Sequence, residues 1–229
     1  MLKNLLGVTI ATLCFSSFSQ ANTSVAANPK HIELFDTRNF CVVCTFNDAI
    51  LSPDTLHNRW HVNTNISASY MYGTLMDRLD LTFGFLYAIK GEHFTIQNSL
   101  VRMINLSYSD LPYFTFIGNQ GELVNFTGTG LTEGNFREAE LDSPIFTETA
   151  LWYTDFTRVK FKNALFINAY IREANFSEAQ LMNADFTNAS LIKVNFTDAN
   201  LRDAKLTTEQ LQDSIVCNAI LPDGSRGAC

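Results

Sequence analysis

Few residues of the chain have the types and spacing that catalysis or metal binding needs. His57 and His61 are four residues apart, the spacing that places two imidazoles on one face of a helix beside a metal ion. No glutamate accompanies them in the arrangement of a zinc hydrolase, and no serine stands in the G-x-S-x-G context of a nucleophile elbow. The sequence therefore predicts no enzyme, no cofactor and no metal centre.

A set of glutamates recurs at multiples of five residues and could be mistaken for an acid–base pair. Catalysis by two carboxylates needs a pocket that holds them away from bulk water. Carboxylates that recur regularly indicate a solvated face instead, and we expect these side chains to point outward. The set is Glu133, Glu138, Glu148, Glu173 and Glu178.

The first residues have the form of a secretory signal peptide. Lys3 precedes an apolar stretch that ends near Phe18, and Ser19-Gln20-Ala21 has the small-x-small form of a cleavage site. We expect residues 1–21 to be removed. The apolar stretch is too short to span a bilayer, so we expect a periplasmic or secreted bacterial protein without stable membrane insertion.

Export changes the interpretation of four cysteines, because disulfides persist in oxidising compartments. Cys41 with Cys44 and Cys217 with Cys229 are the local pairs, whereas long-range pairs between the two ends or free thiols are the alternatives. We expect a structural bridge between Cys217 and Cys229. A redox role for the C-x-x-C is not favoured, because no β-α-β pattern surrounds it.

The main signal of the sequence is a period of five residues. Large apolar residues occupy every fifth position, and the residue two before each of them is usually alanine. Neither the period of a helix, about 3.6 residues, nor the period of a strand, about 2 residues, fits this spacing. A coil with four short sides, one pentapeptide per side, does fit. The central apolar residues are Phe126, Leu131, Phe136, Leu141, Phe146, Leu151, Phe156, Phe161, Phe166, Ile171, Phe176, Leu181, Phe186, Leu191, Phe196, Leu201 and Leu206.

The residue types at each position agree with such a coil. Side chains alternate along an extended strand, so the central residue and the residue two before it both point inward. Phe and Leu alternate at most central positions, which places Phe on two opposite faces of the tube, and Phe161 breaks this alternation. The remaining positions of the regular part carry Thr, Ser, Asn, Asp, Glu and Lys, and we expect them to face water.

The units Ala174-Asn175-Phe176-Ser177-Glu178 and Ala184-Asp185-Phe186-Thr187-Asn188 resemble the A(D/N)(L/F)xx repeats of the pentapeptide-repeat family. The resemblance implies an all-β solenoid, a right-handed quadrilateral β-helix. Residues 37–51 and 217–229 are similar to the opening Cys-x-x-Cys and the closing Cys…Pro-Asp-Gly…Cys segments of exported members.

These signals divide the chain into a signal peptide (1–21), an N-terminal linker and cap (22–40), a β-helix (41–206) and a C-terminal cap (207–229). The β-helix is irregular over 52–122 and regular over 123–206, because Gly91, Gly121 and His61 interrupt the central positions of the first part. Residues 52–95 either continue the tube, which we favour, or form an irregular insertion. In the cap, Thr207 and Gln210 stand in the spacing of a capping box, which predicts a short helix near 208–214.

A long rigid surface without catalytic groups favours an exported, non-catalytic scaffold or protein-binding module. Aromatic residues are enriched at interfaces, so Trp60, Tyr70, Tyr72 and Tyr87 of the irregular part are the candidate partner contacts. The partner and the oligomeric state are not evident from the sequence.

Two other functions fit parts of the sequence. Some members of the family resemble duplex DNA and act on type II topoisomerases, and the net charge of −7 agrees with an acidic DNA mimic. A signal peptide argues against this function, because the topoisomerase is cytosolic. The second alternative is a host-directed secreted factor. Direct nucleic-acid binding is not expected, because Lys and Arg form no basic stripe.

Overall fold

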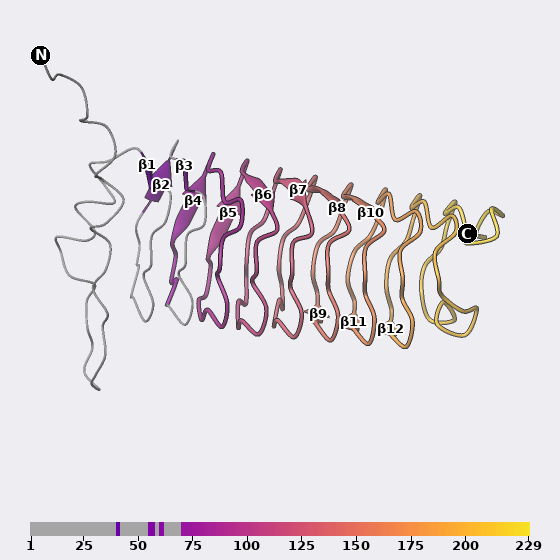
Figure 1. Cartoon of the computed structure of the whole chain (residues 1–229). Coiled ribbons are helices and arrows are strands. Elements are labelled where there is room, and N and C mark those ends of the chain that lie inside the picture. The colour runs from indigo at the N-terminus through magenta and orange to yellow at the C-terminus, as the bar shows by residue number, and fades with distance from the viewer. Residues whose placement is uncertain (1–39, 42–54, 58–59, 62–69) are drawn as a thin grey trace, which may run out of the picture.

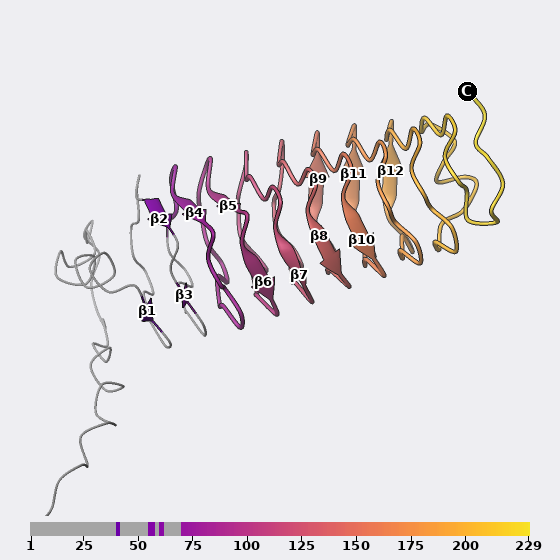
Figure 2. The same ribbon diagram turned by 90° about the horizontal axis from the view of Figure 1, so that it is seen from above.

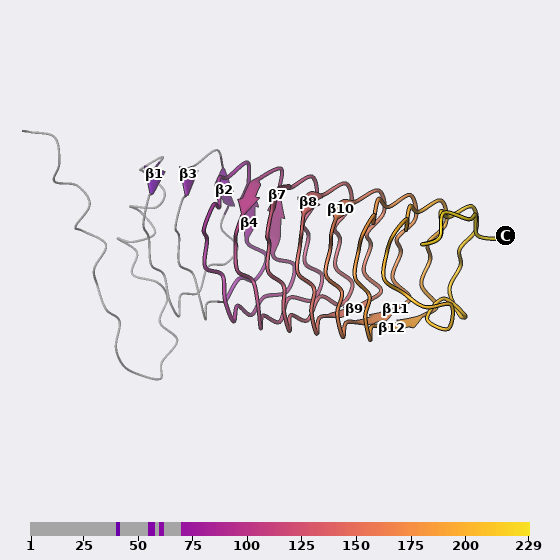
Figure 3. The same ribbon diagram turned by 45° about the vertical axis from the view of Figure 1, so that its right-hand side comes forward.

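A computed structural model describes residues 40–41, 55–57, 60–61 and 70–229, with side chains from residue 70 onward. The chain forms one elongated solenoid whose coils stack along a single axis, with the C-terminus at one end (Figure 1, Figure 2 and Figure 3). Among the described residues all regular structure is β, and no helix long and apolar enough to cross a membrane occurs there. The all-β solenoid predicted from the repeat is confirmed.

The strands are short because each occupies one side of a coil. In the described ranges they are β1 (Phe40–Cys41), β2 (Thr55–His57), β3 (Trp60–His61), β4 (Leu75–Asp77), β5 (Thr95–Gln97), β6 (Leu100–Arg102), β7 (Gln120–Glu122), β8 (Glu140–Asp142), β9 (Ala150–Trp152), β10 (Lys160–Lys162), β11 (Tyr170–Arg172) and β12 (Ser190–Ile192).

All strand pairs are parallel and join residues twenty positions apart, for example Ile171 with Leu151 and with Leu191. Twenty residues therefore make one coil of four pentapeptides. Three sides carry the sheets β2-β4-β5, β6-β7-β8-β10 and β9-β11-β12, and the fourth side is joined by isolated bridges such as Phe85 with Asn105. Pairing of β2 with β4 and of β1 with β3 keeps the same offset, so the described residues between 52 and 95 follow the coil.

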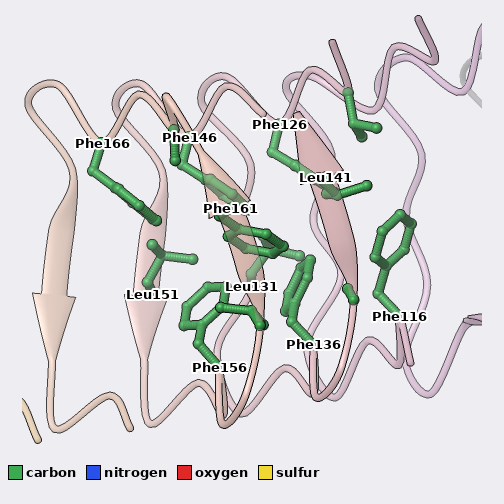
Figure 4. Close-up of a cluster of buried hydrophobic side chains, with 14 of the residues drawn as sticks. Phe116, Phe126, Leu131, Phe136, Leu141, Phe146, Leu151, Phe156, Phe161 and Phe166 are labelled. Carbon is green, nitrogen blue, oxygen red and sulfur yellow. The ribbon is translucent and has the colours of Figure 1, made fainter. Parts of the chain in front are cut away.

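The four faces of the tube are named here after one central residue each: the Leu141, Phe146, Leu151 and Phe156 faces. Each face contains the residues at steps of twenty from the named residue. Along residues 70–204 the central residue and the residue two before it are almost all buried. The core is thus a column of side chains inside the tube (Figure 4).

Phenylalanine rings stack along two opposite faces of this core, as the alternation predicted. On the Phe146 face the rings of Phe126 and Phe146 are stacked nearly parallel, with their centroids 4.8 Å apart and an angle of 7° between their planes. On the Phe156 face the rings of Phe156 and Phe176 are 4.5 Å apart at 10°. Rings of the two rows meet edge to face, which is a favoured geometry of aromatic pairs. Phe161 on the Leu141 face joins the network through Phe146, at 5.8 Å.

Each corner of the coil is made by a left-handed residue two positions after the central residue. The non-glycine residues at these corners have φ between 50° and 60°, a conformation that costs an L-residue about 1–2 kcal/mol. The glutamates that recur in the sequence lie at these corners; Glu133, Glu138, Glu148 and Glu178 are exposed and Glu173 is half-buried. Their predicted outward orientation agrees with the structure.

Gly91 and Gly121 keep the coil in register although each occupies a central position. A Cβ on Gly91 would collide with the carbonyl oxygen of Met71, and a Cβ on Gly121 with that of Val101. The backbones of adjacent coils therefore approach at these two points more closely than a side chain would allow.

The predicted helix near 208–214 is wrong: these residues form consecutive turns. The capping-box contacts themselves exist, because the Thr207 N–H donates to Gln210 Oε1 at 2.8 Å and the Gln210 N–H donates to Thr207 Oγ1 at 3.3 Å. Lys205 and Ile215 both keep the coil register, so the residues between them must travel around two sides. The N–H groups of Leu211 and Gln212 donate to the carbonyl oxygens three residues earlier, of Thr208 and Glu209, whereas an α-helix bonds residues four apart.

Gln210 closes the last coil with its side chain. Its Nε2 donates to the carbonyl oxygens of Phe186 at 2.8 Å and Ala189 at 2.9 Å. Cys217 and Cys229 then form a disulfide with their Cα atoms 4.2 Å apart. Cys41 lies in β1 opposite His61, whereas Cys44 and the signal and linker residues 1–39 lie outside the described residues.

Candidate functional site

Outward side chains form columns along the tube, because residues twenty apart lie in adjacent coils. A surface patch is therefore found by reading the sequence in steps of twenty. Two patches of exposed aromatic and aliphatic side chains emerge in this way, one on the Leu151 face and one on the Phe146 face and its corner with the Leu141 face.

The first patch, the aromatic face, covers the outside of the Leu151 face. Trp152 is 46% exposed and Tyr170 is 58% exposed, and both project from the sheet of β9, β11 and β12. Further along the axis the rings of His93 and Tyr113 stack at 4.8 Å, and those of Tyr70 and Tyr72 lie 6.3 Å apart. The aromatic face consists of Tyr70, Tyr72, His93, Tyr113, Trp152, Tyr153 and Tyr170.

The second patch, the apolar corner, begins at the junction of the Leu141 and Phe146 faces and extends across the Phe146 face to its junction with the Leu151 face, where Tyr108 lies. Phe83, Met103 and Leu123 form one column of exposed side chains in three successive coils, joined by backbone bonds from each N–H to the next coil. Tyr87 projects from the Phe146 face, and its ring meets that of Tyr108, at the next corner, edge to face at 5.8 Å. The apolar corner consists of Phe83, Phe85, Tyr87, Met103, Tyr108 and Leu123.

The partner contacts predicted from sequence do not form one site. Tyr70 and Tyr72 lie on the aromatic face and Tyr87 lies on the apolar corner. Trp60 belongs to β3, in the register of the Leu141 face, and its side chain lies outside the described residues.

Sequence reasoning missed Trp152, Tyr153 and Tyr170. All three lie in the regular part, whose outward positions were expected to be polar. The five-residue period shows only that a residue points outward. The twenty-residue period would have found them, since it groups them on the same face as Tyr113 and Tyr72.

Charges on the described surface are interleaved rather than gathered by sign. Arg158 pairs with Glu138 at 2.7 Å and Lys205 with Asp185 at 2.9 Å, in both cases between adjacent coils. Burial raises the pKa of Asp185, but hydrogen bonds from Thr187 and Lys205 together outweigh it and hold the pKa below its ordinary value. These pairs neutralise carboxylates across neighbouring coils.

The described residues contain no group of three or more histidine, cysteine or acidic side chains arranged to hold a metal ion. His57 and His61, the metal candidates of the sequence, lie in strands β2 and β3 and not on a common helix. A shallow open depression is lined by Asn98, Ser99 and Gly118 and carries no titratable side chain.

Comparison with known proteins agrees with the coil geometry. Residues 139–215 match the family model described as a pentapeptide repeat region. No curated protein matches the chain in sequence.

Two solved structures are similar to this chain. The first is full-length QnrB1, a plasmid-mediated fluoroquinolone resistance protein, with 12% identity, coverage of 80% of this chain and 94% of QnrB1, and a TM-score of 0.44. The second is HetL, a pentapeptide repeat protein involved in heterocyst differentiation regulation from the cyanobacterium Nostoc sp. strain PCC 7120, with 18% identity, coverage of 87% and 97%, and a TM-score of 0.27. The family match falls on coils of four five-residue sides, so residues 139–215 form a pentapeptide repeat region.

Proposed function

We propose that the protein is an exported, non-catalytic module that binds a protein partner on its apolar corner. The observation that carries this proposal is the grouping of six exposed aromatic, methionine and leucine side chains on one corner and the adjoining Phe146 face, over three successive coils. Single exposed apolar residues are normal on a soluble protein, whereas contiguous ones mark an interaction surface.

The composition of the apolar corner suits a protein interface. Phe, Tyr and Met are enriched at the centres of interfaces, and tyrosine is frequent among the residues that dominate binding energy. Polar and charged side chains surround the patch, among them Asp80, Arg102 and Glu122 in neighbouring columns. The corner is also built on a stacked ladder of backbone bonds, which reduces the ordering that association must overcome.

The acidic DNA mimic is less well supported by the charges of the described surface. A mimic of duplex DNA needs a continuous acidic surface, whereas here Arg137, Arg158 and Lys160 alternate with carboxylates of adjacent coils. Export, favoured by residues 1–21, would also separate the protein from a cytosolic topoisomerase. The host-directed factor is a special case of the exported module in which the partner belongs to another organism.

Export is tested by expressing the full chain in a Gram-negative host, fractionating the cells and sequencing the N-terminus of the recovered protein. We expect a periplasmic or secreted species that begins near Asn22. An uncleaved cytosolic species would contradict the proposal and would make a gyrase-protection assay the next measurement.

Binding is tested with the double variant Tyr87→Asp and Met103→Asp, which places two carboxylates in the apolar corner. Met182→Asp is the matched control, because Met182 is 39% exposed but lies outside the corner, farther along the Leu141 face. We expect a stoichiometric protein partner from the envelope fraction of the source organism with the wild type and the control, and its loss with the double variant. The same proteins with all three chains would refute the corner as the site. A wild-type dimer that the double variant converts to a monomer would assign the corner to self-association and so contradict a separate partner.

A further inference from the structure

From the spacing of its rings we propose that the aromatic face binds an extended, neutral β-1,4-linked polysaccharide. The face shares no residue with the apolar corner, and the inference does not depend on a protein partner there. It rests on the axial spacing of the rings, on the polar groups between them and on the charge of the face.

Three of the tyrosine rings, those of Tyr72, Tyr113 and Tyr153, recur at intervals of two coils, whereas the His93 ring stacks on Tyr113 from the coil between Tyr72 and Tyr113, and Tyr170 lies one coil beyond Tyr153. Tyr113 and Tyr153 occupy the same column forty residues apart, with Trp152 adjacent, and Tyr72 lies two coils from Tyr113 in the opposite direction. Neighbouring strands are about 4.8 Å apart, so two coils advance about 9.6 Å. This step is comparable with the length of one disaccharide in an extended β-1,4-linked chain, in which every second sugar presents the same side.

Polar side chains lie between and beside the rings, where sugar hydroxyl groups would be. The coil between Tyr113 and Trp152 presents Gly130, Thr132 and Glu133, of which Gly130 adds no side chain that would lift a ligand from the surface. Arg172 and Glu173 lie one coil beyond Trp152 and pair at 3.5 Å. A sugar has C–H groups on its faces and hydroxyl groups at its rim. The C–H groups pack on the electron-rich face of an aromatic ring, and carboxylates and guanidinium groups bond the hydroxyls.

The charge of the face favours a neutral polymer. Basic side chains on it have acidic neighbours: Lys90 lies near Glu92, and Arg172 contacts Glu173. A phosphate-rich ligand such as a nucleic acid would require a stripe of basic residues, which the described surface lacks.

The Leu151 face is also rigid, which favours binding of a linear polysaccharide. Strands β9, β11 and β12 form one parallel sheet under Trp152 and Tyr170, and the neighbouring coils continue it without insertions. Ring positions fixed by a backbone ladder need little reordering when a linear ligand binds.

The test uses the full mature chain with three insoluble polysaccharides: microcrystalline cellulose, chitin, and granular starch as an α-linked control. We expect retention on cellulose, chitin or both, and none on starch. By calorimetry, cello- or chitohexaose should bind about tenfold or more tightly than the corresponding disaccharide, because only the longer ligand reaches rings two coils apart. No retention on either β-linked polymer, or equal retention on starch, would overturn the proposal.

Variants distinguish binding at the aromatic face from non-specific adsorption to the polysaccharide. Trp152→Ala should reduce retention about tenfold or more, whereas Met182→Ala, which removes an exposed apolar side chain outside the aromatic face, should not change it. The paired exchange Tyr113→Glu with Glu133→Tyr keeps the composition and moves one ring by a single coil. We expect this exchange to weaken hexasaccharide binding as much as loss of Tyr113. Unchanged binding would refute the spacing argument, and circular dichroism would show that each variant keeps the fold.

The corner variant Tyr87→Asp with Met103→Asp keeps the two proposals distinguishable. It should lose the protein partner and retain the polysaccharide, since it leaves every residue of the aromatic face unchanged. Loss of polysaccharide binding in this variant would contradict the assignment to the aromatic face.

Discussion

Gly121 allows the structure to be tested against the repeat pattern, because the two make opposite predictions. It occupies the central position of β7, where the repeat favours Leu or Phe, so a design that follows the repeat would replace it with a larger residue. In the structure, a Cβ at this position would lie well under 3.0 Å from the carbonyl oxygen of Val101. We therefore expect Gly121→Ala to destabilise the protein.

The expected size of this effect follows from two opposing contributions. Replacing glycine by alanine reduces the entropy of the unfolded chain, which stabilises by about 0.4–1 kcal/mol. Overpacking costs about 1–3 kcal/mol, and the upper end applies here because the colliding atom is backbone of β6, held by its pairing with β7. The net loss is about 2 kcal/mol, which for a chain of this size lowers the Tm by about 4–8 °C.

Gly134→Ala is the matched control for this measurement. Gly134 occupies the position two before a central residue, where most sides of the regular part carry alanine. Its added Cβ would lie 3.0 Å from the Leu131 carbonyl oxygen and 3.4 Å from the Phe136 ring, so we expect a change within about 0.5 kcal/mol. Thermal and urea unfolding followed by circular dichroism measure both variants. A Gly121→Ala protein as stable as the wild type would refute the close approach of the two coils.

Three further predictions concern the core, the corners and the coil-to-coil ion pairs. Phe156→Ala removes a fully buried ring and should lower the free energy of unfolding by about 3–5 kcal/mol, measured by urea titration. Glu148→Asn should raise the Tm slightly, because φ is 57° there and the same column carries Asn168 and Asn188; a lower Tm would contradict the cost assigned to the corners. Asp185 has a lowered pKa in the folded protein, so its contribution is present above about pH 4 and is lost as the pH falls through the folded-state pKa. Asp185→Asn should accordingly flatten the decline in unfolding free energy on acidification, and an unchanged pH profile would refute this role.

Much of the fold is predictable from the sequence because the five-residue period determines which side chains are buried and which point outward. The five-residue period identifies Phe146 and Phe156 as core residues, and their alternation with Leu151 predicts the two stacked rows of rings. These predictions succeed because each side of the coil is short and repeats the same local geometry.

Features that depend on contacts between coils were not predictable from the five-residue period. The backbone approach at Gly121 depends on Val101, twenty residues earlier. After Lys205 the chain forms turns with bonds between residues three apart and regains the coil register at Ile215, although the local capping signal at Thr207 is present. The candidate surfaces were likewise not predicted, because Trp152 and Tyr113 are recognised as parts of one face only when residues are grouped in coils of twenty.

The twenty-residue coil also constrains how such a chain can change its length. Duplication of one pentapeptide would turn every later column by a quarter of a revolution, which would place Phe rings above Leu and split the aromatic face between two sides. Duplication of two pentapeptides would preserve the stacked rings but carry later surface residues to the opposite side. Only whole coils of twenty residues conserve the core and the surface together. Gene segments that encode whole coils are therefore the units by which this protein can lengthen a binding surface without rebuilding it.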